Sequence, residues 1–435
     1  MTQYLWSKSD DTAPASQRIQ EYMSGQDVVL DREIFLYDIL ASYAHAAGLQ
    51  AIDVISADEL TAIHDALNDL SKQFQTGQYQ LAPPFEDCHS AIEFWLTEKL
   101  GATGQKVHTG RSRNDQVQVA LRMYMRDQMH HLQEVALRIA AASLQRAHDD
   151  EMTPMPGYTH LQRAVPSSVG LWMASFAESF MDIAELATMT GNWIDCCPLG
   201  TAAGYGVNLP LDRELVAKEL GFSRVQRNPM YVQNSRGRFE LQTLAALSQA
   251  TLELRRLCWD LSLFTTQEFR FVELSPQFVT GSSIMPNKSN PDFVELARGQ
   301  HAVVQGAISE LQALLSVPSG YQRDLQLSKP PLIRAFKSSL MALELTEGLI
   351  KEMVFQKTYM SAAIDNALYS TDIAVERVTK QGLPFREAYK QPVTDDDLAN
   401  RTPEASLQDR VSPGACGDLG LDLLQDRLQQ LTANL

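Results

Sequence analysis

The 435-residue chain lacks the marks of a disulfide-rich, zinc-binding or membrane-spanning protein. Its cysteines are scattered and form no C-x-x-C pair, so we expect buried thiols in a reducing compartment and neither a disulfide framework nor a zinc site. They are Cys88, Cys196, Cys197, Cys258 and Cys416. The start of the chain has no basic stretch followed by an apolar run, and no uncharged apolar run of about 18 residues occurs. We therefore expect a cytoplasmic protein with no signal peptide and no transmembrane helix.

Positive charge is also scarce. There are 37 Lys and Arg residues against 53 Asp and Glu residues, which gives a formal net charge of −16. Sequence-independent binding to nucleic acid needs a basic footprint, and so does docking on an anionic membrane surface, so neither partner is expected. An anionic small molecule is still compatible with this composition, because local charge can oppose the global balance.

Glycine and proline are missing from two long stretches, between Gly110 and Pro154 and from Arg238 to Ser275. Apolar residues recur at helical spacing in both stretches. At about 1.5 Å per residue, each could span on the order of 50 Å. Further helical stretches are predicted over residues 167–190, 292–315 and 332–354, whereas strand-like alternation is nearly absent.

These patterns predict an all-α fold, with an elongated central bundle of long helices and smaller N- and C-terminal helical domains. We place the domains at residues 1–107, 108–355 and 356–435. Glycine and proline concentrate in the connections between helices, which suggests that the chemistry lies at helix ends.

One connection has the composition of a constrained loop. It reads Gly281-Ser-Ser-Ile-Met-Pro-Asn-Lys-Ser-Asn-Pro291, with Lys288 as its only charged residue, and Glu295 follows in a predicted helix. Exposed backbone N–H groups and Lys288 could hold a carboxylate or a developing carbanion. The alternative is an ordinary loop that caps the next helix through Ser289 or Asn290.

This loop resembles the signature loop of the fumarase/aspartase superfamily, whose members eliminate fumarate from substituted succinates. Other segments resemble the motifs of the argininosuccinate lyase family within it, in the family's order and across nearly the whole chain. They are Glu86-Asp-Cys-His89, His108-Thr-Gly-Arg-Ser-Arg-Asn-Asp-Gln116, Gly157-Tyr-Thr-His-Leu-Gln-Arg-Ala164, Tyr321-Gln-Arg-Asp-Leu-Gln-Leu-Ser-Lys329 and Gly382-Leu-Pro-Phe-Arg-Glu-Ala388.

The resemblance implies a reversible β-elimination, argininosuccinate giving arginine and fumarate in arginine biosynthesis, without a cofactor or a metal. It also implies a homotetramer in which long helices of four chains align and each site is built from three subunits. The alternatives are another fumarate-forming lyase such as adenylosuccinate lyase, or an inactive structural homologue of the lens crystallin type.

The resemblance also implies catalytic roles. Ser282 would be the base, with Ser283 as the runner-up, and Lys288 with loop N–H groups would stabilise its oxyanion. His160 is the candidate acid or proton relay, and Glu295 would pair with it and raise its proton affinity. A bound water or another group stays open as the acid.

The remaining candidates would hold the substrate. Ser112, Arg113, Asn114 and Thr159 are expected at the succinyl carboxylates, where arginine offers a bidentate geometry. The argininyl half would contact Tyr321, Gln326 and Lys329, and two further candidates are Asn290 and His89. Arg111 is either a ligand or a structural salt bridge.

Four segments depart from the family's pattern, and one of them is Gly200-Thr-Ala-Ala-Gly-Tyr-Gly206. Ser7-Lys8-Ser9 follows Leu5-Trp6 where Gly-Gly-Arg is usual, and Ser289 stands where a second lysine is common. Ser235-Arg-Gly-Arg-Phe239 replaces a Ser-acidic-Arg-Asp-Phe stretch, so Arg236 and Arg238 are both candidates for its substrate-binding arginine.

Overall fold

The computed structural model describes residues 17–83, 85–399, 401–433 and 435, and most of them are helical, as the sequence predicts. Contacts divide the chain into two compact units. The first unit comprises Met1–His130, Thr188–Ala245 and Gln305–Lys337, and the second comprises His131–Ala187, Ala246–Val304 and Ser338–Leu435. The division into three domains follows other boundaries and stays a prediction.

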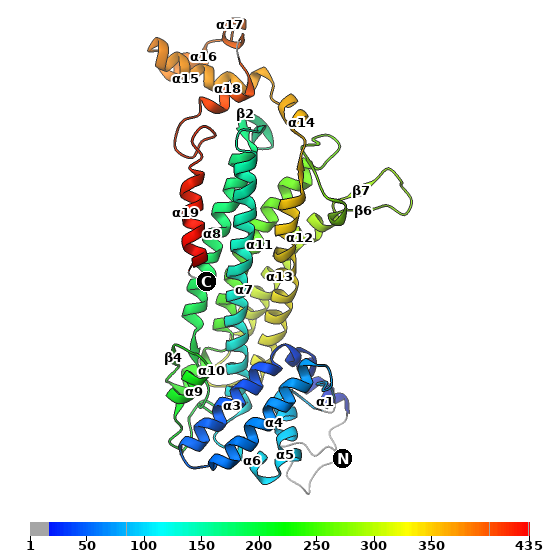
Figure 1. Cartoon of the computed structure of the whole chain (residues 1–435), viewed down its shortest axis with the longest axis vertical. Coiled ribbons are helices and arrows are strands. Elements are labelled where there is room, and N and C mark those ends of the chain that lie inside the picture. Colours follow the sequence, from blue (N-terminus) through cyan, green and yellow to red (C-terminus); the bar gives the residue numbers. More distant parts are fainter. Residues whose placement is uncertain (1–16, 84, 400, 434) are drawn as a thin grey trace. The chain divides into compact units, whose positions relative to one another are not determined.

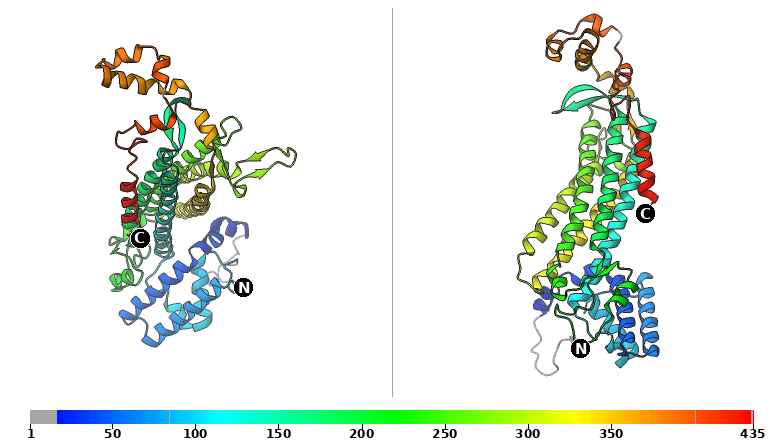
Figure 2. Two further views of the ribbon diagram at one scale, coloured as in Figure 1. Left: turned by 45° about the horizontal axis from the view of Figure 1, so that its top comes forward. Right: turned by 90° about the vertical axis from the view of Figure 1, so that its left-hand side faces the viewer.

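Five helices of the described chain have 23 residues or more, and each contributes residues to both units. They are α7 (Arg113–Asp149), α8 (Val169–Ile194), α11 (Arg238–Phe264), α12 (Asp292–Leu314) and α13 (Lys329–Glu352). Within each unit, the segments of these helices lie side by side (Figures 1 and 2). The longest, α7, has 37 residues and is about 55 Å long, because no glycine or proline interrupts it.

The second predicted run ends earlier than its sequence indicates, because α11 stops at Phe264. The hydroxyls of Thr265 and Thr266 each donate at 2.7 Å to backbone carbonyls three or four residues back. Each of these carbonyls also accepts the backbone N–H of the same threonine, so both residues fold back onto the last turn of the helix. Arg270 then adopts φ 56°, which turns the chain away from the helix direction.

Shorter helices build most of the rest of the first unit, and α4, for example, starts at a capping box of Ser56 and Glu59. The helical elements are α1 (Gln17–Ser24), α2 (Asp27–Leu30), η1 (Asp31–Glu33), α3 (Phe35–Ala51), α4 (Ala57–Gln75), α5 (Cys88–Leu100), α6 (Ala102–Lys106), α9 (Arg213–Glu219), α10 (Pro229–Asn234) and η3 (Arg323–Ser328). Two short strands, β3 (Cys196–Cys197) and β4 (Arg224–Val225), pair in parallel.

The second unit adds short helices and three small antiparallel sheets. The helices are η2 (Pro276–Phe278), α14 (Lys357–Ala362), η4 (Asn366–Tyr369), α15 (Ser370–Gln381), α16 (Phe385–Lys390), α17 (Asp395–Leu398), α18 (Pro403–Gln408) and α19 (Leu421–Ala433). The paired strands are β1 (Pro154–Thr159) with β2 (Gln162–Ser168), β5 (Val272–Glu273) with β8 (Val354–Phe355), and β6 (Thr280–Gly281) with β7 (Ser289–Asn290).

The hairpin of β1 and β2 is the largest element without a sequence signal. Three prolines and a glycine break any alternating pattern along it, and a bulge between Gly157 and Tyr158 shifts the register. Residues of α14, α18 and η4 pack against it. The pairing is therefore set by distant parts of the chain, which local periodicity does not report. No helix of the described residues is long and apolar enough to span a lipid bilayer.

A buried histidine in α3 makes the stability of the first unit depend on pH. Burial, and next the charge of Arg111, lower the pKa of His45 to about 3, and its Nε2 lies 2.9 Å from the carbonyl oxygen of Thr109. In an unfolded chain the pKa is about 6.5. The stabilisation is therefore complete above pH 6.5 and is lost as the pH falls, because only the unfolded chain then takes up the proton.

We expect acidification from pH 6.5 to pH 5 to cost about 2 kcal/mol of stability through His45. His45→Gln, whose amide can still donate to the Thr109 carbonyl, should flatten this dependence. Urea unfolding of both proteins at the two pH values measures the difference. An unchanged pH dependence in the variant would assign the effect to other groups.

Candidate active site

A small polar cavity in the first unit gathers six of the predicted substrate-binding residues. It has a volume of about 150 Å³. The six are His89, Arg113, Asn114, Tyr321, Gln326 and Lys329. They come from the starts of α5, α7 and α13 and from the segment through η3, so the cavity lies at helix ends, as the sequence predicts. Asp27, Glu86, Asp87, Arg236 and Arg323 also line it.

The N-terminus of α7 is held by the side chain of Asp115, which is fully buried. Its Oδ1 accepts from the N–H of Ser112 at 2.9 Å, and its Oδ2 accepts from the N–H groups of Gly200 at 3.0 Å and Ala202 at 2.8 Å. Burial raises the pKa of this carboxyl to about 6, although the three hydrogen bonds favour its charged form. Asp115 thereby fixes the first turn of α7, which begins with Arg113 and Asn114.

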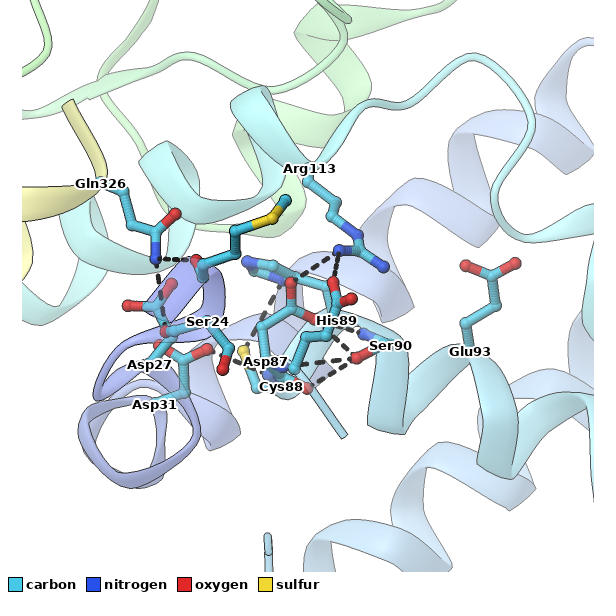
Figure 3. Close-up of polar contacts among 12 residues, drawn as sticks. Ser24, Asp27, Asp31, Asp87, Cys88, His89, Ser90, Glu93, Arg113 and Gln326 are labelled. Carbon is cyan, nitrogen blue, oxygen red and sulfur yellow. Dashed lines mark hydrogen bonds and ion pairs between the residues drawn. The ribbon is translucent and has the colours of Figure 1, made fainter. Parts of the chain in front are cut away.

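Two acidic residues neutralise Arg113. Its Nη1 donates to Glu86 Oε2 at 2.8 Å and lies 3.2 Å from Asp87 Oδ2. Asp87 also caps α5 by accepting from the N–H of Ser90 at 2.8 Å. Figure 3 shows Arg113 pointing toward Asp87, and Gln326 toward Ser24 on the other side of the cluster. In this arrangement Arg113 is paired before any ligand arrives.

Lys329, the first residue of α13, is buried with two aspartates. Its Nζ pairs with Asp31 and lies 3.1 Å from Asp27 Oδ1. Burial alone would lower the pKa of Lys329, but the charges of Asp31 and Asp27 outweigh it and raise that pKa. Lys329 therefore stays protonated, and two carboxylates share its single positive charge.

His89 presents one free nitrogen to the cavity. Its Nδ1 lies 2.7 Å from Asp38 Oδ2, and Cys88 Sγ lies 3.5 Å from that oxygen and 3.6 Å from that nitrogen. The donor atoms of these three residues lie within 4.8 Å of one another, but they already bond to one another, so we assign them to orienting His89. Burial would lower the pKa of His89, and the charge of Asp38 raises it. Its Nε2 is buried and has no hydrogen-bond partner among the residues that the structure describes.

The two candidate arginines near residue 237 lie in different surroundings. Arg236 lines the cavity with 3% of its surface exposed, and its guanidinium stands 5.8 Å from the ring of Tyr321. Its Nε has no hydrogen-bond partner among the described residues, and its charge interacts with the buried carboxylate of Glu240, which lies beyond ion-pair distance. Arg238 is exposed, donates to the hydroxyl of Tyr231 at 3.4 Å and lies outside the cavity. Of the two, only Arg236 faces the site.

The catalytic candidates lie in the second unit, and Ser282 is the best supported by geometry. Strands β6 and β7 close the base of the loop, which projects from its neighbours in that unit (Figure 1). The Oγ of Ser282 accepts from the N–H of Ile284 at 3.3 Å and from the N–H of Met285 at 3.1 Å. Two N–H groups aimed at one oxygen stabilise negative charge on it. Neither bond is made by Ser283, so the loop favours Ser282 as the oxyanion.

The other three catalytic candidates are exposed. The side chains of Lys288, Glu295 and His160 have no hydrogen bond or ion pair within the described part of the chain. Asn290 pairs with Thr280 through the backbone in the sheet of β6 and β7, and Thr159 is exposed beside the hairpin turn. Arg163, in the same hairpin, differs from these exposed groups because it has partners. It forms an ion pair with Asp365 at 3.1 Å and donates to the carbonyl oxygen of Ala363 at 2.8 Å.

His160 occupies a strained turn. Thr159 and Gln162 pair across the hairpin, so His160 and Leu161 form a two-residue turn with φ 53° and 58°. Both positions of such a turn require positive φ, which favours Asn and Gly. Non-glycine residues held there cost on the order of 1 kcal/mol each or more. Strain of this kind is typical of functional sites, where the side chain is needed at that point.

We expect His160→Asn to keep the fold of the hairpin of β1 and β2 and to lose catalytic activity. Asparagine tolerates positive φ, so the melting temperature should stay the same or rise, while kcat falls about 10²-fold or more. Leu161→Asn is the matched control, because it relieves the same strain and keeps the imidazole. Fumarate formation and thermal unfolding measure the two effects. A His160→Asn protein with normal turnover would remove His160 from the mechanism.

The structure therefore collects the predicted residues in two groups. The cavity residues belong to the first unit, whereas Ser282, His160, Lys288 and Glu295 belong to the second. Ser112 caps α7 next to the first group by accepting from the N–H of Asn114 at 3.3 Å. The N-terminal departure around Ser7 and Lys8 lies outside the described residues.

Asp27 is a charged cavity residue that the sequence did not predict. Asp27 stands in no motif, and its only sequence signal is its spacing of four from Asp31, which places two carboxylates on one face of a helical turn. That signal is weak, because such pairs are common on solvated helix faces.

The chain is similar to known proteins along its whole length. A family profile described as "Lyase" matches residues 7–306. An argininosuccinate lyase of Xanthomonas campestris pv. campestris (strain B100) is 52% identical over 433 residues, which cover 99% of this chain and 100% of the relative. An argininosuccinate lyase of Stenotrophomonas maltophilia (strain R551-3) is 51% identical, with 99% and 100% covered. That of Xylella fastidiosa (strain 9a5c) is 52% identical, with 99% and 97% covered.

Solved structures share the fold. An EDDS lyase in complex with formate matches with a TM-score of 0.82 at 22% identity and covers 97% of this chain and 92% of its own. A class II fumarase from Schistosoma mansoni matches with a TM-score of 0.69 at 16% identity, with 91% and 93% covered. At these identities the matches establish the architecture, and the predicted all-α fold is confirmed.

Proposed function

The chain belongs to the argininosuccinate lyase family, a set of carbon–nitrogen lyases, and from that membership we propose that it catalyses the reversible β-elimination of argininosuccinate to arginine and fumarate in arginine biosynthesis. The observation that carries the proposal is the identity of 52% with argininosuccinate lyases over 99% of the chain. The same comparison favours this substrate over that of adenylosuccinate lyase and gives no support to an inactive structural role.

The first chemical step is removal of a proton alpha to a succinyl carboxylate. An ordinary serine hydroxyl is far too weak an acid to serve as a base at neutral pH. In this chain the N–H groups of Ile284 and Met285 donate to Ser282 Oγ, so an alkoxide there would be stabilised before substrate binds. Lys288, on the same loop, adds positive charge for the alkoxide or for the aci-carboxylate that forms. Asn290, on the same loop, is a further candidate contact for a substrate carboxylate.

The second step breaks the C–N bond and protonates the leaving nitrogen. His160 is our candidate for the acid or proton relay, because the hairpin holds it in strained backbone at an exposed tip. Glu295 is exposed and unpaired in the described part of its own chain. Pairing of Glu295 with a His160 imidazole from another subunit would raise the proton affinity of that ring. A bound water remains the alternative acid.

Substrate binding is assigned to the cavity. Arg113, Asn114 and Ser112 at the start of α7, with Thr159 of the hairpin, would hold the succinyl carboxylates, and His89 Nε2 is a further donor to them when its ring is protonated. Tyr321, Gln326 and Lys329 would contact the argininyl half. These roles need no metal and no cofactor, because the carbanionic charge is met by N–H groups and cations of the protein.

We also propose that the enzyme is a cytoplasmic homotetramer with sites shared between subunits. Large apolar side chains are exposed along four of the long helices, which is a pattern of surfaces buried by association. They are Met189 and Trp193 of α8, Leu252 and Trp259 of α11, Leu296 of α12, and Met341 and Leu345 of α13. Association through the long helices would bring the cavity residues of one chain together with the catalytic candidates of another chain.

Purified protein mixed with argininosuccinate should release fumarate, followed by its ultraviolet absorbance, and arginine in equal amount. Adenylosuccinate, malate and aspartate under the same conditions are the controls. Turnover of one of these controls in place of argininosuccinate would refute the substrate assignment, and no turnover of any of them would refute the catalytic role.

A further inference from the structure

A second cavity lies within the second unit, against the hairpin of β1 and β2, and has a volume of about 480 Å³. Of the candidates for the elimination, only Thr159 lines it. We propose that this cavity binds a small organic cation with an apolar body, and that the bound cation modulates turnover through the hairpin that carries His160. The binding is independent of the proposed function, whereas the effect on turnover rests on it.

The walls of this cavity are largely apolar and aromatic. One wall is the hairpin, through residues 155–159 and 164–167, and another is formed by Trp172 of α8 and Phe264 of α11. The rings of Trp172 and Phe264 stand 5.2 Å apart with an interplanar angle of 77°, and the ring of Tyr158 lies 6.4 Å from that of Phe264. Aromatic rings around one space accommodate an apolar body, and their faces attract a cation.

The negative charge of the cavity belongs to Asp260 of α11. Its Oδ2 accepts from Nε1 of Trp172 at 2.9 Å, and it forms no ion pair within the described part of the chain. Burial raises the pKa of Asp260, and the hydrogen bond from Trp172 and the charge of Arg256 oppose that rise. Arg256 itself forms an ion pair with Glu253 at 3.3 Å. A carboxylate withdrawn from water in this way is stabilised by a cation that binds beside it.

Arg410 also lines the cavity, but its charge already has a partner. Its Nη2 donates to Asp372 Oδ1 at 2.7 Å. Because Arg410 and Asp372 neutralise each other, the charge of Asp260 decides the sign of the ligand that the cavity favours. The Nε of Arg410 is buried and has no hydrogen-bond partner among the described residues, so an anion is the competing ligand that the test must exclude.

A ligand in this cavity contacts both strands of the hairpin. Gly157 and Tyr158, at the bulge where the register shifts, line it, and so does Thr159, the last residue of β1. His160 follows directly in the strained turn. A ligand that fits one arrangement of the hairpin better than others shifts the hairpin toward that arrangement. Binding in the cavity is therefore coupled to the position of the imidazole of His160.

The binding test uses three probes of similar shape and different charge: the phenethylammonium ion, 2-phenylethanol and 3-phenylpropionate. Titration calorimetry on the full-length protein should rank phenethylammonium tightest, by about tenfold or more over the alcohol, and the propionate weakest. Asp260→Asn, whose amide oxygen can still accept from Trp172, should remove the preference for the cation and leave binding of the alcohol unchanged. Asp422→Asn removes a carboxylate from an exposed position of α19 outside the cavity and should keep all three affinities.

Turnover tests the coupling to the hairpin. Saturating phenethylammonium should change kcat for argininosuccinate by about twofold or more, with a half-maximal effect at its Kd. Asp260→Asn should abolish this effect at the same concentration of the probe. Asp260→Ser replaces Asp260→Asn should the latter fail to fold.

The outcomes separate this inference from the proposed function. No binding of phenethylammonium, tighter binding of the propionate, or a preference for the cation that survives Asp260→Asn would overturn the cation site. Inhibition that excess argininosuccinate overcomes would place the probe in the substrate site and would overturn the inference as well. Binding without any change in kcat would refute the coupling to the hairpin. If the protein cleaves no argininosuccinate, the proposed function fails, and calorimetry still decides whether the cavity binds the cation.

Discussion

Replacing Ser282 with alanine is expected to lower kcat about 10³-fold with little change in KM. The hydroxyl is the group that accepts from the N–H groups of Ile284 and Met285, so its removal deletes the base while the loop's carboxylate-binding groups remain. A loss confined to kcat is the mark of an interaction made in the transition state. Initial rates of fumarate release over a range of argininosuccinate concentrations measure both constants.

The neighbouring serine supplies the control. Ser283 is equally close in sequence, but its hydroxyl does not accept those two N–H groups, and Ser283→Ala should keep kcat within about threefold of the unsubstituted protein, well below the usual effect of a catalytic base. Neither substitution touches the strands that close the loop, so both proteins should unfold at similar temperatures. Near-normal turnover in Ser282→Ala together with a large loss in Ser283→Ala would transfer the role of base to Ser283.

The long helices could be predicted because their signal is local. A run without glycine or proline, with apolar residues at helical spacing, determines α7 from within its own residues. The hairpin of β1 and β2 has no such signal. Pro154, Pro156 and Pro166 suggest a loop, and only its packing against α14, α18 and η4 makes these residues pair.

The same distinction applies to the site. Ser282, Lys288 and His160 lie in contiguous motifs, so a resemblance could name them, and the hydrogen bonds that distinguish Ser282 from Ser283 required coordinates. Arg236 could be named from its motif as one of two candidates, whereas Asp27 is an ordinary charged residue in sequence. The significance of Asp27 comes from its place in the cavity beside Lys329.

Mixing two inactive variants is expected to restore activity. Ser282→Ala lies in the second unit and Arg113→Gln in the first, and each alone should have under about 1% of normal turnover, because one loses the base and the other a carboxylate ligand. If sites are shared, a hybrid tetramer contains some sites with an intact loop from one subunit and an intact Arg113 from another. Random reassembly of equal amounts should return up to about one quarter of normal activity.

The control mixes two variants whose substitutions lie on the same loop, so that no subunit can supply an intact loop to a shared site. Ser282 and Lys288 stand on one loop, so a mixture of Ser282→Ala and Lys288→Met chains carries a defect in every loop and should stay inactive. Both mixtures are dissociated with mild denaturant, reassembled by dilution and assayed for fumarate, with the tetramer fraction followed by light scattering. Activity confined to the parent proteins, with no gain in the first mixture although tetramers form, would mean that each site is built within one chain.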